Sequence, residues 1–102
     1  MMNQLCFYVS EKQHHEGMML YEWLLEEGKG MGGHGGSAFR AIAGFGRHGR
    51  LHEQTFFELA GELAVKVEFI LDDKTADQLL QRVRAQNLNV FYVCSQVESG
   101  II

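Results

Sequence analysis

Residues 64–73 read Ala-Val-Lys-Val-Glu-Phe-Ile-Leu-Asp-Asp, and this stretch holds the clearest strand of the chain and the start of a helix. Successive side chains of a strand point to opposite faces, so the alternation over 64–71 predicts one face of Val65, Val67, Phe69 and Leu71 and another of Lys66, Glu68 and Ile70. Asp72 or Asp73 is a typical helix N-cap, which predicts a helix from about Lys74 to Gln86. Its apolar stripe is Ala76, Leu79, Leu80 and Val83.

Two further segments, one near each end of the chain, show the same two-residue period. Residues 4–10 alternate Leu5, Phe7 and Val9 with Cys6, Tyr8 and Ser10, and residues 90–98 alternate Phe91, Val93 and Val97 with Tyr92, Cys94 and Gln96. Aromatic and β-branched residues at this period are typical of strands. We therefore expect a first and a last strand, and a core-facing set of Leu5, Phe7, Val9, Val67, Phe69, Leu71, Phe91 and Val93.

Between the first strand and residue 44 the chain changes character three times. Glu11–Gly17 is polar and predicts a connection, with His14-His15 in a solvated loop or as a fragment of a metal site. From Met18 to about Gly28 the spacing of Leu20, Trp23 and Leu24, extended by Glu27, predicts a helix. Residues 28–36 then hold six of the 12 glycines, which favours a flexible joint before a second strand over Ser37–Ala43.

The order of these elements is strand, helix, strand, strand, helix, strand, with an extra strand at Glu53–Leu59. Two βαβ halves with an antiparallel centre form the split βαβ arrangement. The sequence thus predicts an α+β, ferredoxin-like sandwich in a single domain over residues 1–102. A glycine-rich loop or hairpin extension follows its second strand.

The sheet face without helices has a mixed composition. We expect it to carry Cys6, Tyr8, Lys66, Glu68, Ile70, Tyr92 and Cys94, which is too aromatic for a wet surface and too polar for a core. Such a face on a small domain is typical of an oligomer interface, so we predict self-association. Cys6 and Cys94 fall on the same face in this phase, either as free thiols, which a cytoplasmic protein favours, or as a disulfide.

Composition excludes several classes of protein. The formal net charge is −4 and the pI about 5.7, which argues against a general nucleic-acid binder. No apolar run has the length of a membrane span, and the first residues lack the features of a secretory signal. Two cysteines among 102 residues fit a reducing compartment, so we expect a cytoplasmic protein without membrane insertion.

The stretch from Gly35 to His52 is the first place to look for function. After the expected second strand, the chain breaks at Gly44-Phe45-Gly46 and continues with Arg47, His48, Gly49 and Arg50, a basic segment in an acidic protein. Glycine allows close approach of a ligand to backbone N–H groups, and arginine pairs with anions. The alternative is a surface loop in which the glycines only provide turns.

With these motifs placed, the chain resembles the small bacterial proteins known as domain of unknown function 190, members of the PII-like signalling superfamily. The matching segments cover nearly the whole chain and are Leu5–Glu11, Leu20-Tyr21-Glu22, Gly36–Ile42, Gly44-Phe45-Gly46, His52, Val67-Glu68 and Asp72. The chain departs from the family pattern at Ala41, where glycine is usual, and at Leu63-Ala64, where leucine-proline is common.

The resemblance implies a homotrimer with clefts between subunits and a loop after the second strand that contacts a partner protein, such as a membrane transporter or an enzyme. In PII proteins the base of that loop and the segment before the last strand hold an adenine nucleotide. Gly44, Phe45 and Gly46 match the loop base, and Lys66-Val67-Glu68 resembles the Lys-x-Glu of the PII third strand. The PII glycine-lysine turn is unmatched at Gln86–Asn89, and Ser99–Ile102 contains no arginine.

The expected ligand is therefore a small anionic metabolite, with an adenine nucleotide as the candidate and no required cofactor. The candidate ligand-binding residues are Arg40, Gly44, Phe45, Gly46, Arg47, Arg50, Lys66 and Glu68.

Two other functions compete with this interpretation. His48 and His52 are four residues apart and would form a metal site with His14, His15 or His34, although an extended backbone separates them. An enzyme would draw on His52, Glu53, Glu58 or Glu68, but no nucleophile–base–orienter set follows from their spacing. We expect a protein that is not an enzyme.

Overall fold

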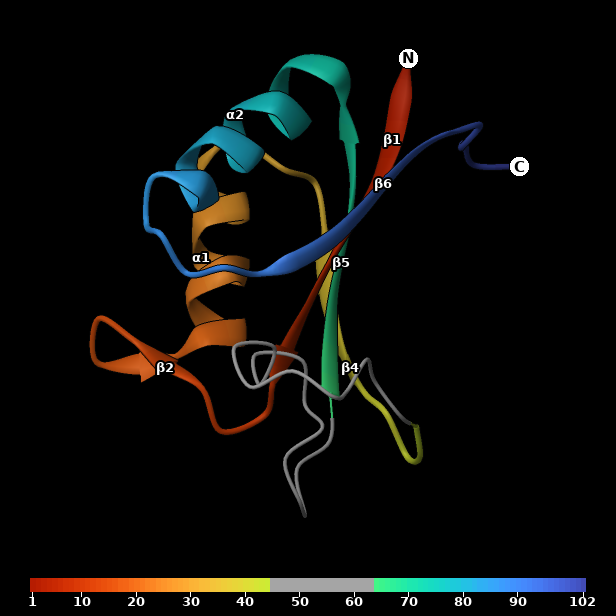
Figure 1. Ribbon diagram of the computed structural model, residues 1–102. Coiled ribbons are helices and arrows are strands. Elements are labelled where there is room, and N and C mark those ends of the chain that lie inside the picture. Colours follow the sequence, from red (N-terminus) through yellow and green to blue (C-terminus); the bar gives the residue numbers. More distant parts are fainter. Residues whose placement is uncertain (45–63) are drawn as a thin grey trace.

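The computed structural model describes residues 1–44 and 64–102. Its elements are β1 (Met2–Ser10), β2 (His14–His15), β3 (Met18–Met19), α1 (Leu20–Gly30), β4 (Gly36–Arg40), β5 (Ala64–Asp72), α2 (Asp73–Arg84) and β6 (Phe91–Val97). Figure 1 shows both helices packed on the same side of the large sheet. The extra strand expected at Glu53–Leu59 lies outside the described residues.

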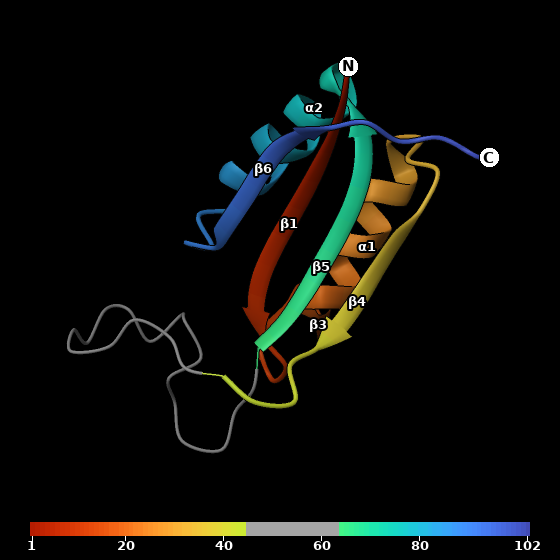
Figure 2. The ribbon, with the colours of Figure 1, turned by 90° about the vertical axis from the view of Figure 1, so that its right-hand side faces the viewer.

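The large sheet has the strand order β4-β5-β1-β6, and each neighbouring pair is antiparallel. Figure 2 looks onto this sheet from the side away from the helices, so that the strands lie in front and α1 and α2 behind. Strand order, direction and the one-sided helices confirm the α+β, ferredoxin-like prediction. None of the helices in the described ranges is long and apolar enough to cross a membrane.

Both helices bury most of the stripe that their spacing predicts, with Glu27 of α1 and Leu80 of α2 only partly buried. The Asp72 carboxylate accepts a hydrogen bond of 2.7 Å from the backbone N–H of Thr75 and caps α2. Ala76, Leu79 and Val83 of α2 are buried, as are Leu20, Trp23 and Leu24 of α1. They pack on the strand residues Leu5, Phe7, Val9, Val67, Phe69 and Leu71, all buried as expected.

A two-stranded hairpin replaces the connection expected at Glu11–Gly17. His14 pairs with Met19 and His15 with Met18. Glu16 and Gly17 between them have φ values of 51° and 84°, and positive φ at both central residues is the signature of a type I′ hairpin turn. Because this pairing takes up residues 18 and 19, α1 begins at Leu20 rather than at Met18.

The predicted phase of the last strand is wrong. In the β1–β6 register, Tyr92 lies opposite Phe7 and Cys94 opposite Leu5, which puts Tyr92 and Cys94 on the helix side of the sheet. Phe91 and Val93, expected in the core, lie on the open face opposite Tyr8 and Cys6. β6 is an edge strand that is exposed over residues 91–96, so its alternation carries no contrast between buried and exposed positions.

The same register shows that the prediction of Cys6 and Cys94 on one face of the sheet is wrong. Cys6 projects to the open face and Cys94 to the helix side, and both are free. Cys6 is buried while Cys94 is exposed. Burial, and secondly the nearby Glu68 carboxylate, raises the pKa of the Cys6 thiol.

The glycine-rich segment between α1 and β4 packs closely on β5. A Cβ added to Gly28 or Gly36 would collide with the ring of Phe69, and one added to Gly33 would lie 2.9 Å from the carbonyl oxygen of Gly28. These glycines therefore allow close approach of α1, β4 and β5, a role that the expected flexible joint does not include. β4 covers Gly36–Arg40 and is shorter than the expected Ser37–Ala43, although the N–H of Ala41 still donates to the carbonyl of Ala64 at 2.9 Å.

Candidate functional site

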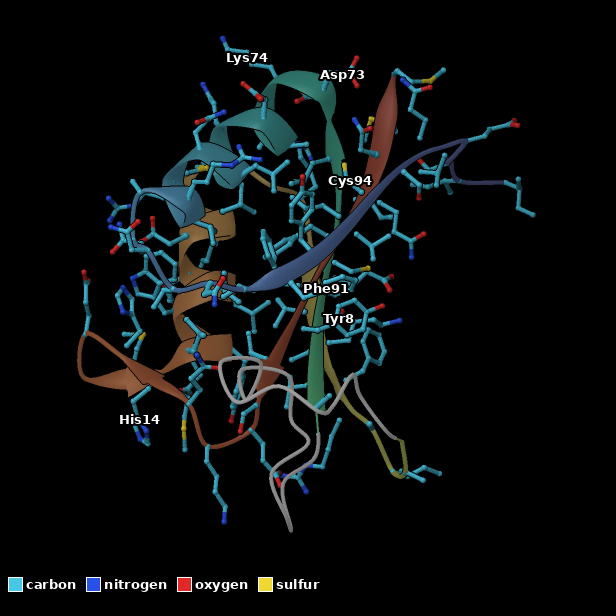
Figure 3. All side chains as sticks on the ribbon, in the orientation of Figure 1. Tyr8, His14, Asp73, Lys74, Phe91 and Cys94 are labelled. Atoms are coloured by element: carbon cyan, nitrogen blue, oxygen red, sulfur yellow. The ribbon has the colours of Figure 1, made fainter. Side chains whose placement is uncertain are left out.

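One row of large side chains crosses the open face of the sheet. The strand register aligns Phe39 with Lys66, Lys66 with Tyr8, and Tyr8 with Phe91. The Lys66 ammonium lies 5.1 Å from the centre of the Phe39 ring, a cation–π distance, and the Tyr8 and Phe91 ring centres are 5.7 Å apart. Figure 3 shows the Tyr8 and Phe91 side chains close together. The row is therefore continuous across all four strands.

Lys66 and Glu68 form an ion pair on this face. They are two residues apart on β5, so both project to the same side, and Lys66 Nζ lies 3.2 Å from Glu68 Oε1. The hydrogen bond to Glu68 raises the pKa of Lys66. Cys6 lies opposite Glu68 in the register, so the ion pair borders a buried thiol. The arrangement joins charge and aromatic surface on one exposed face.

Arg40 lies on the opposite side of the sheet from this pair. It aligns with the buried Val65 at the end of β4, and its Nε lies 3.0 Å from Glu11 Oε1. A groove of about 550 Å³ surrounds this pair, with Lys12, Met19, Tyr21 and Ala38 in its walls. The structure therefore brings Lys66 and Glu68 together but separates them from Arg40.

The other predicted ligand residues follow β4 in the chain. Gly44 is described and exposed, four residues beyond the end of β4. Phe45, Gly46, Arg47 and Arg50 lie outside the described residues, and so do His48 and His52 of the metal alternative.

A second groove of about 460 Å³ lies between the end of α2, the segment before β6, and β6 itself. Leu80, Val83, Leu88, Val90 and Tyr92 give it apolar walls, and Arg84 lies at its edge. Asn87 and Asn89 have φ values of 55° and 61°, a conformation that asparagine tolerates better than most residues. Sequence reasoning missed this groove because it depends on Tyr92, which the predicted phase of β6 places on the other face.

The two adjacent histidines have separate roles in the hairpin. His15 Nε2 lies 3.0 Å from Gln86 Oε1, and its ring packs edge-on against Trp23 with centres 4.7 Å apart. His14 Nδ1 lies 2.9 Å from the carbonyl oxygen of Lys12, and Figure 3 shows its ring pointing outward. Across residues 1–44 and 64–102, no three metal-ligating side chains gather at one point. His15 thus connects the hairpin to the end of α2.

Comparisons with known proteins agree with this fold. The sequence profile of domain of unknown function 190, described as "Uncharacterized ACR", matches residues 2–99. A UPF0166 protein of Aquifex aeolicus (strain VF5) is 32% identical over 83 residues, which cover 81% of this chain and 79% of the relative.

A crystal structure from Thermus thermophilus, provisionally assigned as a PII-like signalling protein, is similar in fold. It has a TM-score of 0.53 and 20% identity over 92% of this chain and 83% of its own. At this identity the likeness concerns the fold alone.

Proposed function

This chain belongs to the family of domain of unknown function 190, and from that premise we propose that it is a PII-like regulatory protein. It forms a homotrimer, senses a small anionic metabolite with an adenine nucleotide as first candidate, and acts on a partner protein through the chain between β4 and β5. It works in the cytoplasm as a sensor, without catalysis or a required cofactor, and contacts neither nucleic acid nor the membrane interior.

The observation that carries this proposal is the connection between β4 and β5. These strands are antiparallel neighbours, and such pairs are usually joined by about two to five residues. Here residues 41–63 join them and include Gly44-Phe45-Gly46, Arg47 and Arg50. This long insertion begins with a basic stretch, residues 44–52, in an acidic protein. A long insertion of this kind in a hairpin supports a role in binding rather than in folding.

The open face supports self-association. Phe39 and Phe91 are 50% and 45% exposed in the single chain, and Val93 is 42% exposed. Together with Tyr8 and Lys66 they form an apolar surface with one cation, and a second copy would remove this surface from water. The trimer would thus place the Lys66–Glu68 pair at or near a subunit boundary.

The ligand site would combine groups from three places. Gly44, Phe45 and Gly46 would offer backbone N–H groups, and Arg47 and Arg50 would offer charge beside Arg40 at the end of β4. Lys66 and Glu68 lie on the other face of the sheet from Arg40, so a neighbouring copy would bring them to the set. Backbone donors and guanidinium groups together suit a phosphate. Ligand binding to this segment would change the surface presented to the partner.

Isothermal titration calorimetry tests the sensing function. We expect heat with at least one of ATP, ADP, AMP and cyclic AMP, measured with and without magnesium, and a loss of affinity of about tenfold or more in Arg47→Ala or Arg50→Ala, because a charge-assisted hydrogen bond is removed. Lys74→Ala, which removes an exposed cation in the first turn of α2, is the control and should bind like the wild type. No heat with any of the nucleotides would remove the nucleotide from the proposal.

A further inference from the structure

More cationic side chains than carboxylates line the groove around Arg40. Two cationic side chains, Lys12 and Arg40, line it with a single carboxylate, Glu11. The lining therefore carries a net positive charge within a chain whose net charge is −4. A concave surface with one sign of charge attracts the opposite ion, so the groove favours an anion.

The ion pair with Glu11 occupies only one of the nitrogen atoms of the Arg40 guanidinium. Glu11 contacts Arg40 through Nε at 3.0 Å. The Glu11 side chain is 21% exposed and that of Arg40 68%, so the carboxylate is the more buried partner and the guanidinium is the accessible one. Because the guanidinium has five N–H donors in a planar fork, its Nη groups can bind a carboxylate or phosphate while Nε keeps its partner.

The rest of the groove's lining is aliphatic or aromatic. Val65 is buried beneath it, Ala38 lies beside it on β4, and Met19 and Tyr21 approach from β3 and α1. A groove of about 550 Å³ with such a lining has room for more than a bare inorganic ion. An inorganic ion alone would leave the apolar surfaces of Met19 and Tyr21 in contact with water. The matching ligand therefore has an apolar body and an anionic end.

We propose that this groove binds a small organic anion, a carboxylate or phosphate on an aromatic or aliphatic body. Arg40 and Lys12 hold the anionic end, and Met19 and Tyr21 pack against the body. The inference rests on the proposed function for the anionic character of the ligand, but it places the contact with Arg40 inside one protomer instead of in a cleft between copies.

Met19 makes the groove observable. The full chain labelled with ¹³C at the methionine methyl groups gives one NMR signal for each methionine, and Met19→Leu identifies the signal from the groove. Titration with phenyl phosphate and with benzoate should shift the Met19 methyl signal to saturation. The tighter of the two probes identifies phosphate or carboxylate as the preferred anionic end. The Met31 signal, which reports on the core, should stay in place.

Two further probes and two variants complete the test. Benzyl alcohol, which has the ring without the charge, and inorganic phosphate, which has the charge without the ring, should each shift the Met19 signal at much higher concentration or not at all. Arg40→Gln should weaken phenyl phosphate binding by at least about tenfold, since a charged hydrogen-bond partner is lost. Arg84→Gln, outside this groove, should bind like the wild type.

Three results would overturn the inference. The first is a Met19 signal that neither phenyl phosphate nor benzoate moves. The second is an Arg40→Gln variant that keeps an unchanged Met31 signal and binds phenyl phosphate as tightly as the wild type does, and the third is benzyl alcohol that binds as tightly as phenyl phosphate. The outcome also separates this site from the proposed function. Nucleotide heat that depends on Arg47, with no movement of Met19, leaves the proposed function standing and removes this groove. Phenyl phosphate binding without heat from any nucleotide supports the groove and removes nucleotide sensing.

Discussion

At the scale of single residues, Phe69 determines where this chain needs glycine. Its ring is 2% exposed and fills the space between α1 and β4. A Cβ on Gly36 would lie 2.7 Å from Phe69 Cε1, and one on Gly28 would meet the same ring atom. Gly30, at the end of α1, has no such neighbour within 4 Å among the residues that the structure describes. Gly28 and Gly36 are thus required for packing against Phe69, whereas Gly30 has space for a side chain.

Gly28→Ala and Gly36→Ala should each lower the free energy of unfolding by roughly 1–3 kcal/mol, because a methyl group is forced into a filled core. Gly30→Ala is the control, and it should leave stability unchanged or raise it by up to about 1 kcal/mol, since alanine favours helix. Urea unfolding followed by circular dichroism measures all three. Equal stability of the Gly28 and Gly30 variants would contradict the packing role of Gly28.

At the scale of elements, α2 depends on a charged cap at the end of β5. The hydrogen bond from the backbone N–H of Thr75 lowers the pKa of Asp72 below its ordinary value of 3.8. A carboxyl whose pKa is lower in the folded chain stabilises the fold at pH values above its unfolded pKa. That contribution is lost as the pH falls below about 3.8 and through the lowered folded value.

Asp72→Asn separates the cap from its charge. Asparagine caps helices about as well as aspartate, so the variant should unfold near the wild-type temperature at pH 7 and lose less stability than the wild type between about pH 4 and pH 2. Asp72→Ala removes the acceptor itself and should unfold at lower temperature already at pH 7. Thermal unfolding at several pH values compares the three proteins. Identical pH profiles for wild type and Asp72→Asn would show that Asp72 does not contribute this dependence.

At the scale of the whole molecule, both helices lie on one side of the sheet, and no helix of residues 1–44 and 64–102 covers the other face. Phe91 and Tyr92 are adjacent in sequence, exposed to 45% and 40%, and on opposite faces of β6. This pair allows the two faces to be compared by substitution at nearly equal exposure. Only the Phe91 face carries the row with Tyr8, Lys66 and Phe39.

Phe91→Asp should convert the proposed trimer to a monomer of 11.6 kDa, because a charge would be buried without a partner at the interface. Tyr92→Asp, on the helix side, should keep the oligomer. Light scattering after size-exclusion chromatography gives the mass of each, and circular dichroism verifies that both variants are folded. A wild-type protein that elutes as a monomer, or a Tyr92 variant that dissociates as readily, would count against the open face as the interface.

The agreement between sequence and structure follows the contrast between buried and exposed positions. β1, β5 and the two helices have one face in the core and one outside it. Their apolar residues therefore recur with the period of a strand or a helix, and most of the predicted core residues are buried. β6 has no such contrast, and its predicted phase is wrong. The β2–β3 hairpin escapes prediction because two paired residues per strand are too few to show a period.

By itself the sequence determined the order of β1, α1, β4, β5, α2 and β6, narrowed the cap of α2 to Asp72 or Asp73, and identified most residues of the central core. These properties depend on side chains a few positions apart. Only the tertiary structure decided that Arg40 pairs with Glu11 and that Cys94 lies on the helix side of the sheet. It also decided that Gly28 and Gly36 pack against the ring of Phe69. Those properties depend on strand register and on contacts between residues far apart in the chain, which a local pattern does not contain.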